Sequence, residues 1–235
     1  MLNNLIRELR ENSSREKSEV SRKFFKTGKG EYGEGDIFIG LTMPQQRSIT
    51  KRYTELSFQD LQKLLDSKIH EHRMSALIIL ISKYKKTKKD FFEKRRIYEF
   101  YMKNTQNINN WDLVDISCPH IVGDFLSREG TETIKILAKS NNIWEKRIAI
   151  ISTHALIKKR ILGETLAISD ILINDKHDLI HKAVGWMLRE VGKKNMEVLE
   201  LFLKPRYKEM PRTMLRYAIE KFPEEKRKSY LQGKI

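Results

Sequence analysis

The sequence has few of the residues that stabilise small secreted or fibrous proteins. Its 235 residues include one cysteine, 11 glycines and 5 prolines. A lone cysteine, Cys118, cannot form an internal disulfide, and so little glycine and proline excludes a collagenous or low-complexity chain. The longest apolar run, 76–81, is far below the roughly 20 residues that span a bilayer. With no signal peptide at its start, we expect a folded, soluble, cytoplasmic protein without a membrane partner.

Acidic residues are also scarce relative to basic ones. The chain has 46 Lys and Arg against 31 Asp and Glu, a net charge of +15. The surplus is concentrated in 61–110, around the run 83–89. Such a cluster favours a polyanionic partner, because cations that neutralise nucleic acid release its counterions. A solvated helix end and loop would explain the same run equally well.

The hydrophobic pattern predicts an all-α fold. Apolar residues recur at helical spacing along almost the whole chain, whereas alternating runs typical of strands are scarce. Helical segments also recur with a loose period of about 33–37 residues: aligning 110–112 on 143–145 needs a shift of 33. Units of this size are typical of helical pairs of the ankyrin, tetratricopeptide or HEAT class, which stack into a curved solenoid. We therefore expect one solenoid domain over 1–235, whose concave basic face could hold a duplex.

Capping residues and glycines predict where some helices begin and end. Asn142 and Asp175 each precede an acidic residue by three positions, which is the pattern of a helix start. Gly130, Gly163 and Gly192 are predicted to end helices.

Two motifs match known sites only in part. The glycines of 28–33 have the spacing GxGxxG, but no buried strand precedes them and no helix follows, so a flexible loop is predicted. His177 and His181 are four residues apart, yet they lack the glutamate and the third ligand of a zinc protease. We interpret them as surface or base-contacting histidines. His70 and His72 also lack a ligand partner at suitable spacing, and we expect neither a metal nor a cofactor.

The most informative pair is Trp111 and Asp115. Because they are four residues apart, an indole and a carboxylate share one helical face. Taken alone, a core tryptophan and a capping or salt-bridging aspartate would explain the pair. Two later segments, 142–147 and 182–190, each contain a further tryptophan close to arginine and glutamate, and they change that interpretation.

Together, the segments 111–115, 142–147 and 182–190 resemble the AlkD family of bacterial DNA alkylation repair glycosylases. The likeness extends to 24–36 and 44–47 upstream and to 210–221 downstream, so it covers nearly the whole chain. The resemblance implies a solenoid of HEAT-like repeats that grips duplex DNA on its concave face. It further implies a monofunctional glycosylase that releases N3- or N7-alkylated purines. The implied partner is double-stranded DNA containing alkylated bases, and we expect a monomer.

The resemblance also implies which residues form the site. The family's site residues map onto Trp111, Asp115, Arg147 and Trp186, and its aromatic residue near the N-terminus, a tyrosine in some members, maps onto Phe24. Additional phosphate contacts are predicted from the basic run, with Lys83, Lys85 and Lys86, and from Arg189, Arg212 and Arg216.

The residue types agree with this chemistry. A purine alkylated at N3 or N7 is already cationic and departs as a neutral base, so no general acid is needed and one carboxylate suffices. Asp115 is predicted to stabilise the oxocarbenium ion and to orient the attacking water. The indoles of Trp111 and Trp186 attract a nearby cation by about 0.5–2 kcal/mol, and Arg147 is predicted to anchor a phosphate beside the lesion. The resemblance implies that the base stays in the duplex, whereas most glycosylases extrude it.

Two other functions fit parts of the sequence. One is a non-catalytic solenoid that binds damaged or branched DNA, and the other is a protein-binding HEAT scaffold. The carboxylate of Asp115 among tryptophans favours an enzyme, because a protein that only binds phosphates has no use for an acidic group in its groove.

Overall fold

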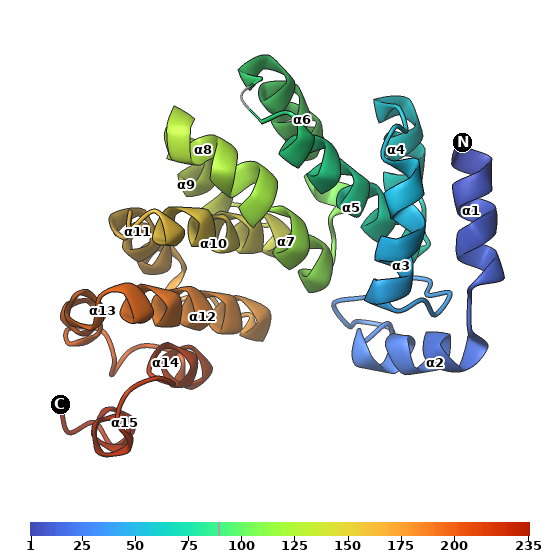
Figure 1. Cartoon of the computed structure of the whole chain (residues 1–235). Helices are drawn as coiled ribbons and strands as arrows, with labels where there is room; N and C mark the ends of the chain where they lie inside the picture. Colours follow the sequence, from blue (N-terminus) through green and yellow to red (C-terminus); the bar gives the residue numbers. More distant parts are fainter. Residues whose placement is uncertain (89) are drawn as a thin grey trace. The chain divides into compact units, whose positions relative to one another are not determined.

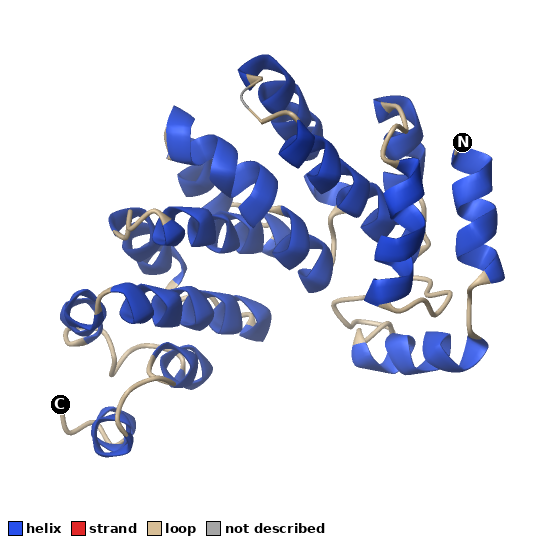
Figure 2. Cartoon of the chain, in the orientation of Figure 1, coloured by secondary structure: helices blue, strands red, loops and turns tan. Residues whose placement is uncertain are grey.

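The chain is helical throughout the part that this computed structural model describes, residues 1–88 and 90–235. Within those residues there is no strand, only an isolated parallel bridge between Ile37 and Ile69 (Figure 2). The prediction of an all-α fold is confirmed. Lys89, part of the predicted basic run, lies outside the described residues. None of the described helices is long and apolar enough to cross a membrane.

The chain divides into two compact units, Met1–Ser117 and Cys118–Ile235. The first unit contains α1 (Leu2–Glu11), α2 (Arg15–Phe24), α3 (Met43–Thr50), η1 (Lys51–Tyr53), α4 (Phe58–Leu65), α5 (His70–Lys86), α6 (Phe91–Lys103), η2 (Thr105–Asn107) and α7 (Trp111–Ser117). Helix α5 (Figure 1) contacts α3, α4, α6 and α7. Most of its residues are buried. It therefore forms the centre of this unit.

The second unit is built from stacked helical pairs. It contains the π-helix η3 (Pro119–Gly123), α8 (Asp124–Glu129), α9 (Glu132–Ala138), α10 (Ile143–Lys158), α11 (Gly163–Leu172), α12 (Asp178–Lys194), α13 (Met196–Leu203), α14 (Arg212–Ala218) and α15 (Glu224–Leu231). Helix α12 packs between α10 and α14, while α9 packs on α11 in a second layer.

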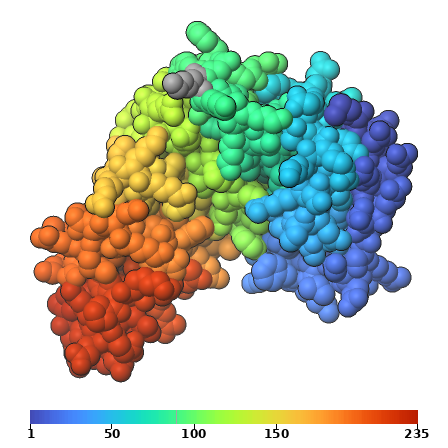
Figure 3. Space-filling model, viewed as in Figure 1, coloured from blue at the N-terminus to red at the C-terminus, as the bar shows by residue number. Residues whose placement is uncertain are grey.

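The spacing of these pairs agrees with the predicted repeat. Helices α10, α12 and α14 begin 35 and 34 residues apart, within the period that the sequence predicts for helical pairs. In the space-filling view, successive segments of this unit form adjoining bands in chain order, from yellow to red (Figure 3). Each pair therefore buries its apolar faces against the next pair.

Two of the predicted helix boundaries, at Asn142 and Gly130, are correct. The side chain of Asn142 accepts a hydrogen bond from the amide of Trp144 and caps α10. Gly130 ends α8 with a φ of +103°. The predicted start at Asp175 is wrong, because the carboxylate of Asp175 binds the amide of His177, and α12 begins after His177.

Gly163 and Gly192 were predicted to end helices, and both predictions are wrong. Helix α10 ends before Arg160, which itself adopts a φ of +62°, and Gly163 begins the next helix. Gly192 lies inside α12, where a Cβ atom would come within 2.5 Å of Leu199 in α13. Its role is close packing between helices.

A widened helical turn follows α7. Pro119 has no N–H to donate to the carbonyl of Asp115, which an α-helix would require. Instead, the amide of Gly123 donates to the carbonyl of Cys118 at 2.9 Å, five residues earlier, as in a π-helix. Cys118 is buried and is not part of a disulfide, as expected of a lone cysteine.

Candidate functional site

Helix α7 presents the predicted indole and carboxylate on one face. Val114 and Ser117 on its other side are buried, whereas Trp111 and Asp115 are half-buried. Residues four apart lie one above the other on an α-helix. Trp111 and Asp115 are therefore neighbours on the part of α7 that remains accessible.

An aromatic cluster surrounds Trp111. Its members are Phe24, Phe25, Phe38, His70 and Trp111. The ring of Phe24, 63% exposed, meets Trp111 edge-on with centroids 5.9 Å apart. Phe25 stacks on Trp111 at 5.3 Å and on Phe38 at 4.9 Å, and Phe38 in turn stacks on His70 at 4.5 Å. The structure thus brings Phe24 and Trp111 together, and joins them to a buried histidine.

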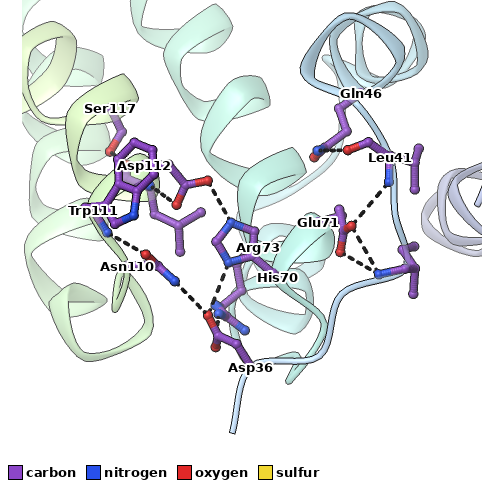
Figure 4. Close-up of polar contacts among 12 residues, drawn as sticks. Asp36, Leu41, Gln46, His70, Glu71, Arg73, Asn110, Trp111, Asp112 and Ser117 are labelled. Atoms are coloured by element: carbon purple, nitrogen blue, oxygen red, sulfur yellow. Dashed lines mark hydrogen bonds and ion pairs between the residues drawn. The ribbon is translucent and has the colours of Figure 1, made fainter. Parts of the chain in front are cut away.

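A buried network of hydrogen bonds and ion pairs lies next to this cluster (Figure 4). It consists of Asp36, His70, Arg73, Asn110 and Asp112. Asp36 accepts from Arg73 Nη2 at 2.6 Å, from Asn110 Nδ2 at 3.1 Å and from His70 Nδ1 at 3.3 Å. Nε2 of His70 lies 2.8 Å from Oδ2 of Asp112. The network therefore connects α5 to the start of α7 and to the segment before α3.

The geometry requires His70 to be a cation. Both ring nitrogens face carboxylate oxygens, so both must donate, and only the imidazolium ion carries two N–H groups. Burial opposes this charge, but the carboxylates of Asp112 and Asp36 outweigh it and raise the pKa of His70 to about 9. Burial likewise opposes the charge of Asp36, yet the hydrogen bond from His70 and the charge of Arg73 hold the pKa of Asp36 below its usual value. Two carboxylates and two cations thus balance one another.

A second buried carboxylate fixes the chain leading into α3. Glu71 is 2% exposed and accepts hydrogen bonds from the amides of Ile39, Gly40 and Leu41. Figure 4 shows the bond from Leu41. Gly40 has a φ of +85° and packs directly on the backbone of Ser14, where a Cβ atom would not fit. This segment is therefore held in place from both sides.

The glycine-rich segment 28–35 forms a series of turns. The amide of Gly28 donates to Glu31 and the amide of Gly30 donates to Glu34, both at 2.8 Å. No helix follows it, because residue 37 is a bridge residue, so the predicted loop is confirmed.

In the second unit, Trp186 is half-buried on α12. Its indole N–H donates to Glu190, one turn later, at 3.2 Å. Glu190 also accepts from Lys193 at 2.7 Å and lies 3.6 Å from Nε of Arg189. Partial burial opposes the charge of Glu190, but Lys193 and Arg189 hold its pKa below the usual value. The ring of His154 lies 6.2 Å from the indole.

Arg147 on α10 is only 5% exposed. Its Nη1 donates to the carbonyl of Leu179, in the first turn of α12, at 2.6 Å. The guanidinium therefore links two neighbouring repeats. A phosphate contact would compete with this bond, and the predicted contact stays a prediction.

The three other arginines predicted to bind phosphates differ in their surroundings. Arg189 pairs with Glu220 of the segment after α14 and is largely covered. Arg212 and Arg216 are exposed, and their spacing of four residues places them on one face of α14. Among the described residues, no carboxylate is within ion-pair distance of either. Both can therefore meet a phosphate without breaking an existing ion pair.

Helix α5 ends in the predicted basic run of the first unit. Lys85 and Lys86 are exposed and Lys83 is half-buried. Lys86 pairs with Glu55 at 2.9 Å. The structure thus places these lysines at the last turn of α5, where cations also favour the negative end of a helix dipole.

His177 and His181 have structural partners. Nδ1 of His177 accepts from the amide of Leu179 and caps α12, and His181 Nε2 lies within hydrogen-bond distance of the carbonyl of Asp175. In the described part of the chain, no group of three or more His, Cys, Asp or Glu residues could hold a metal ion.

Sequence reasoning missed most of the groups around Trp111. His70 has no ligand partner near it in sequence, and the spacing of Asn110 and Asp112 along the chain does not point to it. The partners of His70 lie 34 and 42 residues away along the chain. The one local signal was the dipeptide Trp111-Asp112 following Asn110, since asparagine and aspartate favour helix starts.

Comparisons with known proteins agree with the helical repeats and with the resemblance in the sequence. A protein described as a predicted DNA alkylation repair enzyme from Enterococcus faecalis has a similar fold, with a TM-score of 0.68 at 16% identity, over 90% of this chain and 97% of that one. AlkD2 from Streptococcus mutans aligns with a TM-score of 0.56 at 18% identity, over 78% of this chain and 91% of that one. No curated protein matches the sequence significantly. Residues 5–222 match the family described as DNA alkylation repair enzyme, and the chain belongs to this family, as its tryptophan segments predicted.

Proposed function

We propose that this protein is a monofunctional DNA glycosylase that releases cationic N3- or N7-alkylated purines, such as 3-methyladenine and 7-methylguanine, from duplex DNA. The observation that carries the proposal is the pairing of Trp111 with Asp115 on the accessible face of α7, beside the exposed ring of Phe24. Membership of the DNA alkylation repair family supports the same chemistry. The protein acts as a monomer and without a cofactor.

The reaction follows from the charges involved. The bond from the sugar C1′ to the base nitrogen breaks, and its electron pair neutralises the cationic purine. Positive charge then develops on the sugar, where the carboxylate of Asp115 stabilises it. Asp115 also orients a water molecule, whose oxygen bonds to C1′ while its proton passes to the carboxylate and on to solvent. The indoles of Trp111 and Trp186 each offer an electron-rich face to a cation.

Binding relies on phosphate contacts that do not depend on base sequence. Arg212 and Arg216 are the best supported contacts, because both are exposed on one face of α14. Lys83, Lys85 and Lys86 add positive charge at the end of α5. For Arg147 and Arg189 to bind phosphates, each must share its guanidinium with a partner inside the protein.

The decisive experiment measures release of methylated bases from alkylated duplex DNA in the presence of EDTA. The wild type should release 3-methyladenine or 7-methylguanine. The substitution Asp115→Asn keeps the shape of the side chain and removes its charge. It should lower the single-turnover rate by about 10²–10³-fold, the scale of lost electrostatic stabilisation, and leave the Kd for DNA within about twofold.

The alternative is a protein that binds DNA without chemistry. The exposed Arg212 and Arg216 would serve such a protein equally well, since phosphate binding does not need Asp115. Under this alternative, no alkylated duplex loses a base, either with the wild type or with Asp115→Asn. Absence of release by the wild type from every alkylated duplex would refute the glycosylase.

A further inference from the structure

His70 lies at the junction of three segments of the first unit. It is 2% exposed, at the start of α5. Asp36 faces it from the segment between α2 and α3, Asp112 faces it from α7, and Arg73 lies one turn along its own helix. The rings of Phe25 and Phe38 cover it, at 5.2 and 4.5 Å between centroids. A cation is thus held between two carboxylates and against aromatic faces.

The two residues on either side of Trp111 belong to the same network. Asn110 is fully buried; its Nδ2 donates to Asp36, and its Oδ1 accepts from the amide of Trp111 at 2.8 Å. Asp112 uses one oxygen for His70 and the other for the amide of Leu113, also at 2.8 Å. The first turn of α7 is therefore bound to the network through both side chains that flank the indole.

The network also acts on the rings that contact Trp111. Phe25 stacks on Trp111, and its ring centroid lies 5.2 Å from that of the His70 imidazole. Phe24, the next residue, meets the indole edge-on. A change at His70 therefore reaches Trp111 along two routes, through the hydrogen bonds of α7 and through the packing of Phe25.

We propose that His70 is a positioning residue for the Trp111–Asp115 face of α7: as an imidazolium ion bound between Asp36 and Asp112, it fixes the direction in which the indole and the catalytic carboxylate point. This inference rests on the proposed function of that face. It assigns to α7 a buried ionic support that does not itself touch DNA. Without its charge the imidazole ring keeps a single N–H, so one of the two carboxylates loses its hydrogen bond to His70, and Arg73, which binds Asp36, is the cation that remains in the network.

This role makes the reaction sensitive to alkaline pH. The pKa of His70 is raised to about 9, because Asp112 and Asp36 outweigh the effect of burial. The support is therefore complete at neutral pH, and it is lost as the pH rises through about 9. A base-release rate that depends on this support falls over the same range.

The test combines three variants of the network with one matched control. His70→Gln removes the charge and keeps a side chain of similar length. Asp112→Asn removes one of the two carboxylates, and the double variant restores the balance of charge. His72→Gln is the control, because His72 lies on the same helix and is also buried, but its ring binds Ser67 and not the network. Single-turnover release is measured between pH 6 and 10, and spontaneous release without protein is subtracted.

The expected result separates positioning from folding. His70→Gln should lower the rate at pH 7 about tenfold, abolish the fall near pH 9 and leave the Kd for DNA within twofold. The double variant should recover the rate to within about threefold of the wild type without the alkaline fall, and His72→Gln should behave as the wild type. A wild-type rate and an unchanged alkaline fall in His70→Gln would overturn the inference. An equal loss in His72→Gln would do the same, because it would indicate general damage to α5.

Two measurements do not depend on enzyme activity. The imidazole Hε1 signal of His70 is assigned as the one that disappears in His70→Gln. It should titrate near pH 9 in the wild type and at a lower pH in Asp112→Asn. If His70→Gln does not fold, this shift in Asp112→Asn identifies the signal instead. Amide exchange at Trp111 and Leu113, whose N–H groups bind Asn110 and Asp112, should be at least tenfold faster in Asp112→Asn than in the wild type. Unchanged exchange contradicts the positioning role. Absence of base release by the wild type instead refutes the proposed function, and the two failures are thereby distinguished.

Discussion

The two units contain the same local pair, a tryptophan followed by a carboxylate four residues later, in different surroundings. Next to Trp111, the flanking Asn110 and Asp112 reach a buried network in which His70 and Arg73 balance two aspartates. In the second unit, the carboxylate Glu190 itself binds the indole of Trp186 and is neutralised by Lys193 and Arg189. Equal spacing therefore does not imply an equal role.

The difference suggests a division of tasks between the two tryptophans. At the start of α7, the side chains of Asn110 and Asp112, which flank the indole of Trp111, bind the network around His70. On α12, the acidic partner of the indole is occupied by cations of its own helix. We therefore expect chemistry at Asp115 and only orientation of the indole at Glu190.

The largest expected effect compares the two carboxylates directly. Where Asp115→Asn lowers the release rate by about 10²–10³-fold, Glu190→Gln should lower it by only about threefold, because glutamine can still accept the hydrogen bond of the Trp186 indole. Both rates are measured under single-turnover conditions on the same methylated duplex. A loss for Glu190→Gln as large as that for Asp115→Asn would erase the distinction between the two pairs.

A smaller effect is expected from the packing beside Trp186. A Cβ atom at Gly185 would lie 2.5 Å from the backbone oxygen of Met214 and from Cβ of Tyr217, both in α14. Gly185→Ala should therefore reduce the free energy of unfolding by about 1–3 kcal/mol and weaken DNA binding, because α14 carries Arg212. Urea denaturation and DNA titration measure the two effects.

Gly163→Ala is the matched control for this substitution. No atom lies within 4 Å of a Cβ placed at Gly163, in the first turn of α11. Alanine there should leave stability unchanged or raise it by about 0.4–1 kcal/mol. If Gly185→Ala is as well tolerated as Gly163→Ala, the close contact of α12 with α14 does not limit stability.

The smallest effect concerns binding alone. Replacing Arg212 and Arg216 together by glutamine should reduce the slope of log K against log salt by about 1.8, or about 0.9 for each lost phosphate contact. The substitution Lys86→Gln should change this slope by less, because Lys86 already pairs with Glu55. Titration of unmodified duplex between 50 and 200 mM salt measures both slopes. A larger change for Lys86→Gln than for the double arginine variant would indicate that the main DNA contact lies in the first unit.

Local rules of sequence predicted much of the fold. Hydrophobic periodicity predicted helices throughout, and the spacing of helical segments agrees with α10, α12 and α14. Asn142 caps its helix as expected, because an N-cap acts on residues within one turn. The prediction that Gly192 ends a helix is wrong, because this glycine makes room for Leu199 of another helix, a contact that neighbouring residues in the sequence do not indicate.

The candidate site was only half predictable. The pair Trp111 and Asp115 follows from spacing within one helix, and the family resemblance indicated Arg147 and Trp186. Neither indicated that Arg147 would be buried and bonded to the carbonyl of Leu179. The prediction that these four residues share one site stays a prediction, as does that of a single domain over 1–235.

The amino-acid sequence by itself determined that the chain is helical, that its helices repeat, that it is strongly basic and that one helical face carries an indole beside a carboxylate. These properties depend on residue types and on spacings of a few residues, over which the backbone geometry is known in advance. Only the tertiary structure decided that His70 is a buried cation, because its charge depends on Asp36 and Asp112, which are distant in sequence and meet it only after the first unit has folded. Long-range packing sets the dielectric surroundings and the neighbouring charges, and these in turn set the protonation state on which the support of α7 depends.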